Sequence, residues 1–342
     1  MPDPMSSERL HTDERRSDPV MTYLAATREA MIEEMERDSR VFLMGEDIAK
    51  QGGVFGQFEG LADRFGVERI RDTPISEAAI IGSAVGAALT GSRPVVEMQF
   101  ADFLACAMDE LVNQAAKMRY MFGGQGSVPL VVRAPQGAIR SAAAQHSQSL
   151  EAWFCHVPGW RVVAPSNPAD AKGLLKTAIR SDDPVLYFEH KALYTTKGRV
   201  PAGEWLVPLG SSEVIRTGSD LTIVSWSLSV RHAMEAAEQL DHEGISAEVV
   251  DLRTLAPLDM DTVVNSATHT GRVLIVHESV RFCGLGAEIA AQLGERPFGV
   301  LKAPVLRLAN PGVPVPFAPS LERAALPQVE DIVNATRELV SI

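Results

Sequence analysis

Short β-branched runs alternate with helical stretches along most of the chain, and this alternation constrains the fold more than any other feature of the sequence. In the first half, the runs that read as strands are residues 41–45, 93–100, 128–134, 160–165 and 184–189. The stretches between them carry apolar residues at helical spacing, at 21–38, 78–90, 101–122 and 168–181. Such alternation predicts an α/β fold, a mostly parallel sheet covered by helices on both faces.

A second alternation follows a stretch rich in proline and glycine, in which the pattern lapses. Its expected strands are 220–227, 247–254, 271–279 and 304–310, and its expected helices are 230–243, 259–268, 284–295 and 329–340. A chain of 342 residues is too long for one small core, so two domains are expected. We therefore expect a disordered tail at 1–19, a first α/β domain at 20–196, a linker at 197–211 and a smaller α/β domain at 212–342.

Charge and composition exclude several classes of function. A formal net charge of −12 without a basic stripe argues against a nucleic-acid partner. No apolar run approaches the roughly 20 residues that span a bilayer, and the first residues lack the apolar core of a signal peptide. The cysteines Cys106, Cys155 and Cys283 lie far apart without CxxC spacing, which argues against a disulfide framework or a zinc site. The sequence thus predicts a cytoplasmic protein that binds neither nucleic acid nor membrane.

Glu77 is an ionisable residue placed directly before an uncharged stretch, 78–90, that has no polar face. A helix without a polar face is normally buried. One interpretation is local: Ser76 is a plausible N-cap, and an acid in the first turn gains roughly 0.3–1 kcal/mol from the helix dipole. The other is functional, because Glu77 would lie at the carboxyl edge of a parallel sheet, where such folds bind ligands. The residues alone leave both open.

A second candidate is His146, in the polar cluster AAAQHSQS, whose serines and glutamines could fix the tautomer of its ring. The segment FLMGEDI places Glu46 directly after an expected strand, although a surface turn with solvated acids explains it as well. GLGAEIA lacks the third glycine of a dinucleotide fingerprint and is better explained as a tight helix start. His277 and Glu278 are compatible with a strand end that has no catalytic task. The residues alone therefore predict a ligand site near Glu77 and His146.

Several segments occur in the order shown by one known family. They are FLMGEDI, RDTPISEAAIIGSAVGAALTG, EMQFADF, NQAAKMRYMFGG, AAQHSQSLEAWF and VVDLRTLAPLD. From about Met21 to the C-terminus the sequence resembles the beta subunit of the thiamine diphosphate-dependent decarboxylating component of 2-oxoacid dehydrogenase complexes. The resemblance implies two transketolase-like domains, a pyrimidine-binding domain and a smaller C-terminal domain. EHKALYTTKG and the HSQSLEAW context are most similar to acetoin- or pyruvate-type members, and less similar to branched-chain ones.

The resemblance also implies roles for individual residues. The position of Glu77 matches a glutamate that hydrogen-bonds N1′ of the cofactor's aminopyrimidine ring and favours its imino form. A buried carboxylic acid suits this role, because desolvation favours its protonated form. Phe103 matches the aromatic position that packs on the aminopyrimidine, and His146 matches a histidine that faces the thiazolium and assists acyl transfer to the lipoyl group. The remaining pocket-lining positions are those of Glu46, Ile75 and Gln99.

The resemblance further implies that the cofactor is shared with a partner. The sequence lacks the Gly-Asp-Gly…Asn segment that holds Mg²⁺ and the diphosphate, and in this family the alpha subunit carries it. An α₂β₂ tetramer is expected, with Gly82 and Gly86 on a subunit-contact helix, and with the second domain building the interface and docking the lipoyl-bearing acyltransferase. Relatives also bind a monovalent cation, K⁺, through mainly backbone oxygens. The matching positions here are Val128, Leu130, Val131, Ala178, Ser181 and Asp183.

Three alternatives remain. A branched-chain 2-oxoacid dehydrogenase beta subunit would share the same motifs. A non-catalytic assembly subunit would have lost some pocket residues, whereas Glu46, Glu77, Gln99, Phe103 and His146 are all present. A transketolase-like enzyme acting alone would need the missing diphosphate and Mg²⁺ segment, so its absence argues against that reading.

Overall fold

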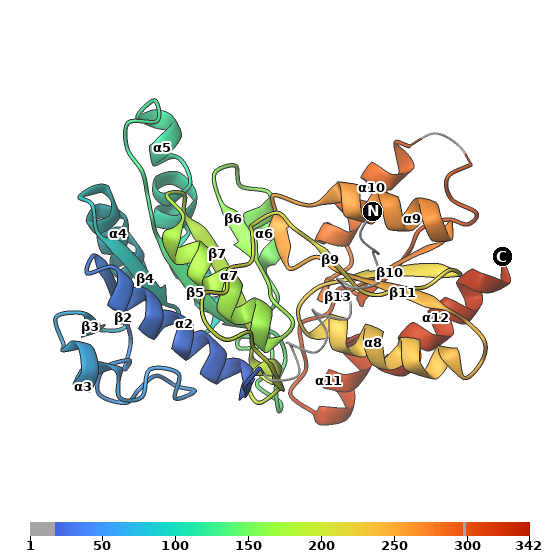
Figure 1. Ribbon diagram of the computed structural model, residues 1–342, viewed down its shortest axis with the longest axis horizontal. Coiled ribbons are helices and arrows are strands. Elements are labelled where there is room, and N and C mark those ends of the chain that lie inside the picture. The colour runs from blue at the N-terminus through green and yellow to red at the C-terminus, as the bar shows by residue number, and fades with distance from the viewer. Residues whose placement is uncertain (1–17, 297–298) are drawn as a thin grey trace, which may run out of the picture.

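The computed structural model describes residues 18–296 and 299–342, so most of the tail expected at 1–19 lies outside the described residues. Figure 1 shows two α/β domains side by side, the first blue to green and the second yellow to red. Each is built on a mainly parallel sheet with helices on both faces. The predicted fold class, two α/β domains with mostly parallel sheets, is confirmed.

The first domain contains a seven-stranded sheet in the order β12-β6-β7-β5-β4-β2-β3. In that order the strands are Thr254–Ala256, Arg161–Val163, Val185–His190, Val131–Gln136, Arg93–Glu97, Val41–Gly45 and Ile70–Asp72. All neighbours pair in parallel except β12, which runs antiparallel to β6. β12 comes from the second half of the chain, so the strand expected at 247–254 is too long. It ends at Asp251, and Thr254 joins the other domain's sheet. A small separate sheet pairs β1 (Val20–Thr22) with β8 (Lys197–Arg199).

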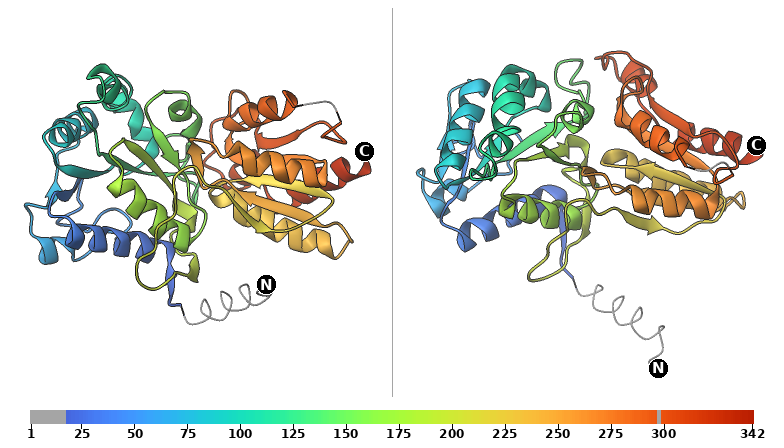
Figure 2. Two further views of the ribbon diagram at one scale, coloured as in Figure 1. Left: turned by 45° about the horizontal axis from the view of Figure 1, so that its top comes forward. Right: turned by 90° about the horizontal axis from the view of Figure 1, so that it is seen from above.

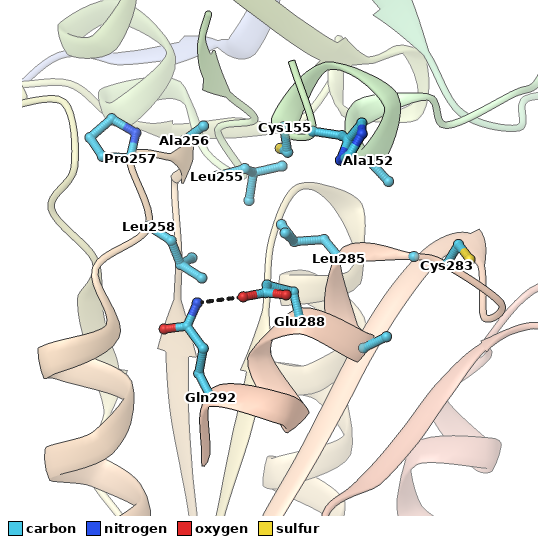
Figure 3. A pocket seen from close by; sticks show the side chains of 13 residues that line it. Ala152, Cys155, Leu255, Ala256, Pro257, Leu258, Cys283, Leu285, Glu288 and Gln292 are labelled. Atoms are coloured by element: carbon cyan, nitrogen blue, oxygen red, sulfur yellow. Dashed lines mark hydrogen bonds between the residues drawn. The ribbon is translucent and has the colours of Figure 1, made fainter. Parts of the chain in front are cut away.

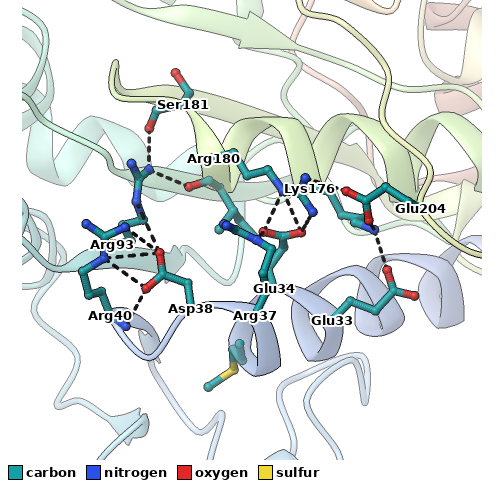
Figure 4. Close-up of polar contacts among 12 residues, drawn as sticks. Glu33, Glu34, Arg37, Asp38, Arg40, Arg93, Lys176, Arg180, Ser181 and Glu204 are labelled. Carbon is teal, nitrogen blue, oxygen red and sulfur yellow. Dashed lines mark hydrogen bonds and ion pairs between the residues drawn. The ribbon is translucent and has the colours of Figure 1, made fainter.

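Helices cover both faces of this sheet. On one face α2 (Tyr23–Arg37) packs against α7 (Pro168–Arg180), and on the other face lies α4 (Glu77–Leu89). Figure 4 shows the polar contacts between α2 and α7, in which Lys176 Nζ bridges Glu33 (2.7 Å) and Glu204 (2.9 Å). The short helices of this domain are α3 (Leu61–Phe65), α5 (Met118–Met121), α6 (Glu151–Cys155) and the 3₁₀ segment Lys191–Leu193.

The prediction of a single regular helix at 101–122 is wrong. The segment consists of a 3₁₀ helix (Ala101–Ala107), a π-helical turn (Glu110–Ala115) and α5. It packs against α4, and the Glu110 side chain lies 3.4 Å from where a Cβ at Gly82 would be. This tertiary contact overrides the regular spacing that the apolar pattern alone predicts.

A buried ion triad links three neighbouring strands on the α2/α7 face. The Arg133 guanidinium, fully buried, donates to both carboxylate oxygens of Glu189 (2.8 Å each) and to Glu97 (2.9 Å). Burial raises the pKa of Glu97 to about 7, although Arg133 opposes the shift. Removing one partner of such a group leaves an uncompensated buried charge, so the triad fixes how β4, β5 and β7 align.

The second domain has a five-stranded sheet in the order β14-β13-β10-β11-β9, in which only β9 is antiparallel. These strands are Leu306–Asn310, Val273–Val280, Leu221–Ser225, Ala247–Asp251 and Glu213–Arg216. α8 (Leu228–Asp241) and α12 (Val329–Ser341) cover one face; α9 (Met260–Thr270) and α10 (Leu285–Gly294) cover the other, and α11 (Pro319–Ala325) lies near the first domain.

The two domains share one apolar core. A single cluster of buried side chains runs from α4 and β5 through α6 to Trp226, Leu252 and Ile275 of the second domain. At the junction, Trp226 Nε1 donates to the buried Glu151 carboxylate at 2.9 Å. The views in Figure 2 show the domains in contact along this junction. In the described part of the chain, no helix is long and apolar enough to cross a membrane.

Candidate functional site

The residues predicted for the site lie at the carboxyl edge of the first sheet. Gly45 ends β2 and pairs with Asp72 of β3 and with Glu97 of β4, so the segments after all three strands meet at one edge. A Cβ at Gly45 would lie 2.9 Å from Glu97 Cβ, and this close approach explains the glycine. Residues beyond the carboxyl ends of parallel strands are where such folds bind ligands.

Two carboxyl groups come together at this edge. Glu46 follows β2 and is buried, with 8% of its surface exposed, and Glu77 begins α4. Burial raises the pKa of Glu46, and the charge of the nearby Glu77 raises it further. The expectation that Glu77 is itself buried is wrong for the single chain, in which Glu77 is half-buried. A carboxyl group that keeps its proton beside a second carboxylate can share that proton with a ring nitrogen.

The start of α4 differs from its predicted form in two ways. Ser76 occupies the N-cap position, but its Oγ donates to the carbonyl of Pro74 rather than accepting a bond from the helix. The helix buries only the face of Ile80, Ile81, Ala84, Val85 and Ala88. The opposite face of the helix carries small exposed residues. The Ile75 side chain, just before the helix, is 82% exposed. The prediction of a fully buried helix is therefore wrong for this chain, because the helix forms the outer layer of its domain.

An aromatic cluster lies at the same edge of the sheet as the Glu46 and Glu77 carboxyl groups. The His146 ring packs edge-on against Phe100 (centroids 4.7 Å apart) and against Phe103 (5.6 Å). Phe100 and Phe103 meet each other at 5.8 Å. The structure thus joins two residues that the sequence analysis placed in one pocket, from the loops after β4 and β5. Sequence reasoning missed Phe100, although it lies between Gln99 and Phe103 in the same QFADF segment.

Lys191 is a second residue that sequence reasoning missed. Its side chain is buried, and its ammonium group lies over the Phe100 ring, 5.4 Å from the centroid. Burial lowers the pKa of Lys191 to about 8. Within the described residues, Lys191 Nζ, Asp102 Oδ2, Gln136 Oε1 and Ser147 Oγ are buried polar atoms near this edge without a hydrogen-bond partner. Buried polar atoms of this kind usually bind water or a ligand.

The remaining predicted positions divide between the two edges of the sheet. Gln99 is half-buried after β4, at the carboxyl edge. The backbone positions expected to hold a monovalent cation lie near the start of β5 and around the end of α7, at the opposite edge. There the Leu130 carbonyl accepts from Val185 N (2.8 Å), and the Ser181 carbonyl accepts from the Arg93 guanidinium (2.9 Å). These oxygens therefore lie apart from the carboxyl pair and the aromatic cluster.

A cavity of about 520 Å³ lies where the two domains meet (Figure 3). It contains none of the predicted site residues. Figure 3 shows Cys155 and Cys283 in its wall, together with the hydrogen bond from Gln292 to Glu288 (2.8 Å). Burial raises the pKa of the Cys155 thiol far above its usual range, which disfavours the thiolate form. Within residues 18–296 and 299–342, no three His, Cys, Asp or Glu side chains are arranged to hold a metal ion.

Two protein families match the chain, one for each domain. The "Transketolase, pyrimidine binding domain" family matches residues 20–197, and the "Transketolase, C-terminal domain" family matches residues 210–332. The first match includes every residue of the carboxyl pair and of the aromatic cluster.

Relatives of similar length are named for several different activities. The beta subunit of 2-oxoisovalerate dehydrogenase from Bacillus subtilis is 48% identical, with 94% of this chain and 98% of that protein covered. The beta subunit of acetoin:2,6-dichlorophenolindophenol oxidoreductase from Cupriavidus necator is 47% identical, covering 92% and 95%. The beta subunit of the pyruvate dehydrogenase E1 component from Rickettsia felis is 44% identical, covering 93% and 98%. These identities are too close to one another to separate the three substrates.

Solved structures agree with the fold. A split-gene transketolase, described as an inactive beta4 tetramer, is 25% identical with a TM-score of 0.73, and the match covers 94% of this chain and 98% of that one. A transketolase from Leishmania mexicana is 18% identical with a TM-score of 0.71, and the match covers 96% of this chain but 47% of that one. The second likeness shows the fold alone.

Proposed function

The chain belongs to the family of beta subunits of thiamine diphosphate-dependent 2-oxoacid dehydrogenase first components, and from this premise we propose a function for its site. With an alpha subunit it decarboxylates a 2-oxo acid or cleaves acetoin, and it passes the acyl group to the lipoyl arm of an acyltransferase. The observation that carries the proposal is the position of the Glu46–Glu77 pair and the Phe103–His146 contact at one sheet edge.

The residues at this edge fit the aminopyrimidine half of thiamine diphosphate. Phe103 is partly buried and offers a flat apolar surface for a ring to pack on. Burial and the charge of Glu77 raise the pKa of Glu46. A protonated carboxyl group at this edge could donate a hydrogen bond to a ring nitrogen. Gln99 and the exposed Ile75 side chain extend the same surface. Because the Ile75 side chain is 82% exposed, covering it with the cofactor and the partner subunit would remove apolar surface from water, which is favourable.

When bound, thiamine diphosphate supplies the electron sink for cleaving the bond next to the substrate carbonyl. Glu77 would hold N1′ of the cofactor's ring by sharing a proton with it, which would favour the tautomer needed for activation. Phe103 orients the ring. His146, packed between Phe100 and Phe103, holds or gives a proton at the dithiolane sulfur of the lipoyl group during acyl transfer.

The other half of the site belongs to an alpha subunit in this proposal. Since the sequence lacks the Gly-Asp-Gly…Asn segment, the alpha subunit holds the diphosphate and Mg²⁺. The exposed small residues on α4, with Gly86 among them, support a close subunit contact in an α₂β₂ tetramer, whereas Gly82 is half-buried beside Glu110 of the same chain. A K⁺ ion at the carbonyls near Val128–Val131 and Ala178–Asp183 would share the Ser181 oxygen with Arg93, and its role would be structural, because these carbonyls lie at the opposite edge from the carboxyl pair.

The substrate is proposed as acetoin or pyruvate, from the EHKALYTTKG and HSQSLEAW contexts. Co-expression with the alpha subunit, followed by kcat/KM for acetoin, pyruvate and branched 2-oxo acids, tests it directly. We expect the two-carbon donors to give the higher kcat/KM. A higher value for branched 2-oxo acids would assign the chain to that class. No turnover with any of them would favour a non-catalytic assembly subunit.

His146→Ala is expected to affect the two half-reactions unequally. Acylation of lipoamide should fall by about 100-fold or more, in line with the usual contribution of a general acid or base. Decarboxylation measured with an artificial electron acceptor should fall much less, because that assay bypasses the lipoyl group. Both rates are measured on the assembled enzyme. Equal losses in the two assays would contradict this role for His146.

A further inference from the structure

The loop that carries His146 has an unfavourable backbone. It joins β5 to α6, and Arg140, Ser141 and Ala143 have φ values of 45°, 62° and 64°. Residues other than glycine are strained in this region and persist there only where the surroundings impose the conformation. The contacts that impose this conformation therefore also determine where His146 lies.

One carboxylate of the second domain binds both ends of the loop. Glu278, on β13, accepts hydrogen bonds from Ala138 N (2.7 Å) and from Ser149 Oγ (3.5 Å) through the same oxygen. The loop also closes on itself here, since Gly137 N donates to the Gln148 carbonyl at 3.2 Å. The ends of the loop are thus held together and against the other domain.

The second oxygen of Glu278 is bound by a buried histidine. His190 Nε2 lies 2.8 Å from it, and His190 Nδ1 accepts a hydrogen bond from Ala192 N at 3.2 Å. Because Nδ1 accepts, Nε2 carries the proton and donates to Glu278. A Cβ at Gly137, whose φ is +80°, would lie 2.0 Å from His190 Nε2, so only glycine fits beneath this pair.

The carboxylate form of Glu278, which only accepts hydrogen bonds, is favoured at this position. Burial raises the pKa of Glu278, but His190 and the Ala138 N–H favour the carboxylate and bring the pKa below its usual value. The tip of the loop has a similar contact, because Ser141 N donates to Glu322 Oε2 on α11 at 3.0 Å. Both ends and the tip are therefore held by carboxylates of the second domain.

We propose that Glu278 is a positioning residue, through which the second domain holds the His146 loop so that His146 packs against Phe100 and Phe103. The proposal rests on the function proposed above for His146. It gives the second domain a task inside the site, in addition to subunit assembly. Glu278 acts through the loop and does not touch the substrate.

A double-mutant cycle on the assembled alpha–beta enzyme tests this. Four proteins are compared: wild type, Glu278→Ala, His146→Ala and the double variant. Lipoamide acylation is measured beside the artificial-acceptor rate. We expect Glu278→Ala to lower acylation by up to about 100-fold, the size of effect that a small misplacement of a reacting group produces. In the His146→Ala background the same change should have no effect on acylation.

Controls separate positioning from folding. Glu278→Gln keeps one oxygen for Ala138 N and Ser149 Oγ but cannot accept from His190 Nε2, so it should restore part of the acylation rate lost in Glu278→Ala. Glu288→Gln removes an exposed acid from the same domain and should leave the ratio of the two rates unchanged. If Glu278→Ala does not assemble, the cycle is run with Glu278→Gln, whose loss should likewise vanish with His146→Ala.

The same fold-loss in both backgrounds would overturn the positioning role. If His146→Ala alone leaves the ratio of the two rates unchanged, the function proposed for His146 fails instead, which distinguishes the two failures.

Discussion

Replacing Glu77 by Gln should lower kcat of the assembled enzyme by about 100-fold or more, the usual contribution of an acid–base group. The amide keeps the size of the side chain but cannot give or take the proton that Glu77 would share with the cofactor ring. Assembly with the alpha subunit should be unchanged, because Glu77 is half-buried and the helix is anchored by its apolar face. The measurement is kcat with an artificial acceptor, together with the melting temperature and the mass of the complex.

The competing interpretation treats Glu77 as an acid that stabilises the start of a helix. That role is worth roughly 0.3–1 kcal/mol, so it predicts a lower melting temperature and an unchanged kcat. Asp63→Asn is a matched control, since Asp63 is an exposed acid in the first turn of α3. If the Glu77→Gln variant behaves like this control, the capping interpretation of Glu77 is supported and the catalytic one is contradicted.

Much of the fold could be predicted because central strands are buried on both faces. Such strands are nearly continuous runs of β-branched and apolar residues, and the run at 41–45 coincides with β2. α4 was predicted to follow Glu77, and it begins there. Strands at the edges of the sheets were harder to predict. β9 is short and partly exposed. β12 is short and mostly buried, and it pairs with a strand about 90 residues earlier in the chain.

That the candidate residues meet at one sheet edge could be predicted, but the contacts among them could not. Order along the chain places Glu46, Glu77 and Phe103 after neighbouring strands, and a parallel sheet then brings them to one edge. The raised pKa of Glu46 depends on burial, which the sequence pattern assigned to the wrong member of the pair. The hydrogen bond from Ala138 N to Glu278 joins residues 140 positions apart, and no local sequence pattern predicts it.

His277 and Glu278 also show that the sequence does not reveal which residues make contacts between the domains. Both were explained as a strand end without a catalytic task. His277 is buried and stacks on Trp226, 5.0 Å between ring centroids, which fits that interpretation. Glu278 points instead across the domain junction to the loop of His146. Adjacent residues on a strand face opposite sides of the sheet, so their roles can differ completely.

The central claim is that this chain supplies half of a shared active site. The direct test measures thiamine diphosphate-dependent turnover of acetoin and pyruvate by this chain alone, by the alpha subunit alone and by the two together, with an artificial electron acceptor and Mg²⁺ present. Our account predicts negligible turnover and weak cofactor binding for each chain alone, and full turnover when they are mixed. Full activity of this chain without a partner would contradict it.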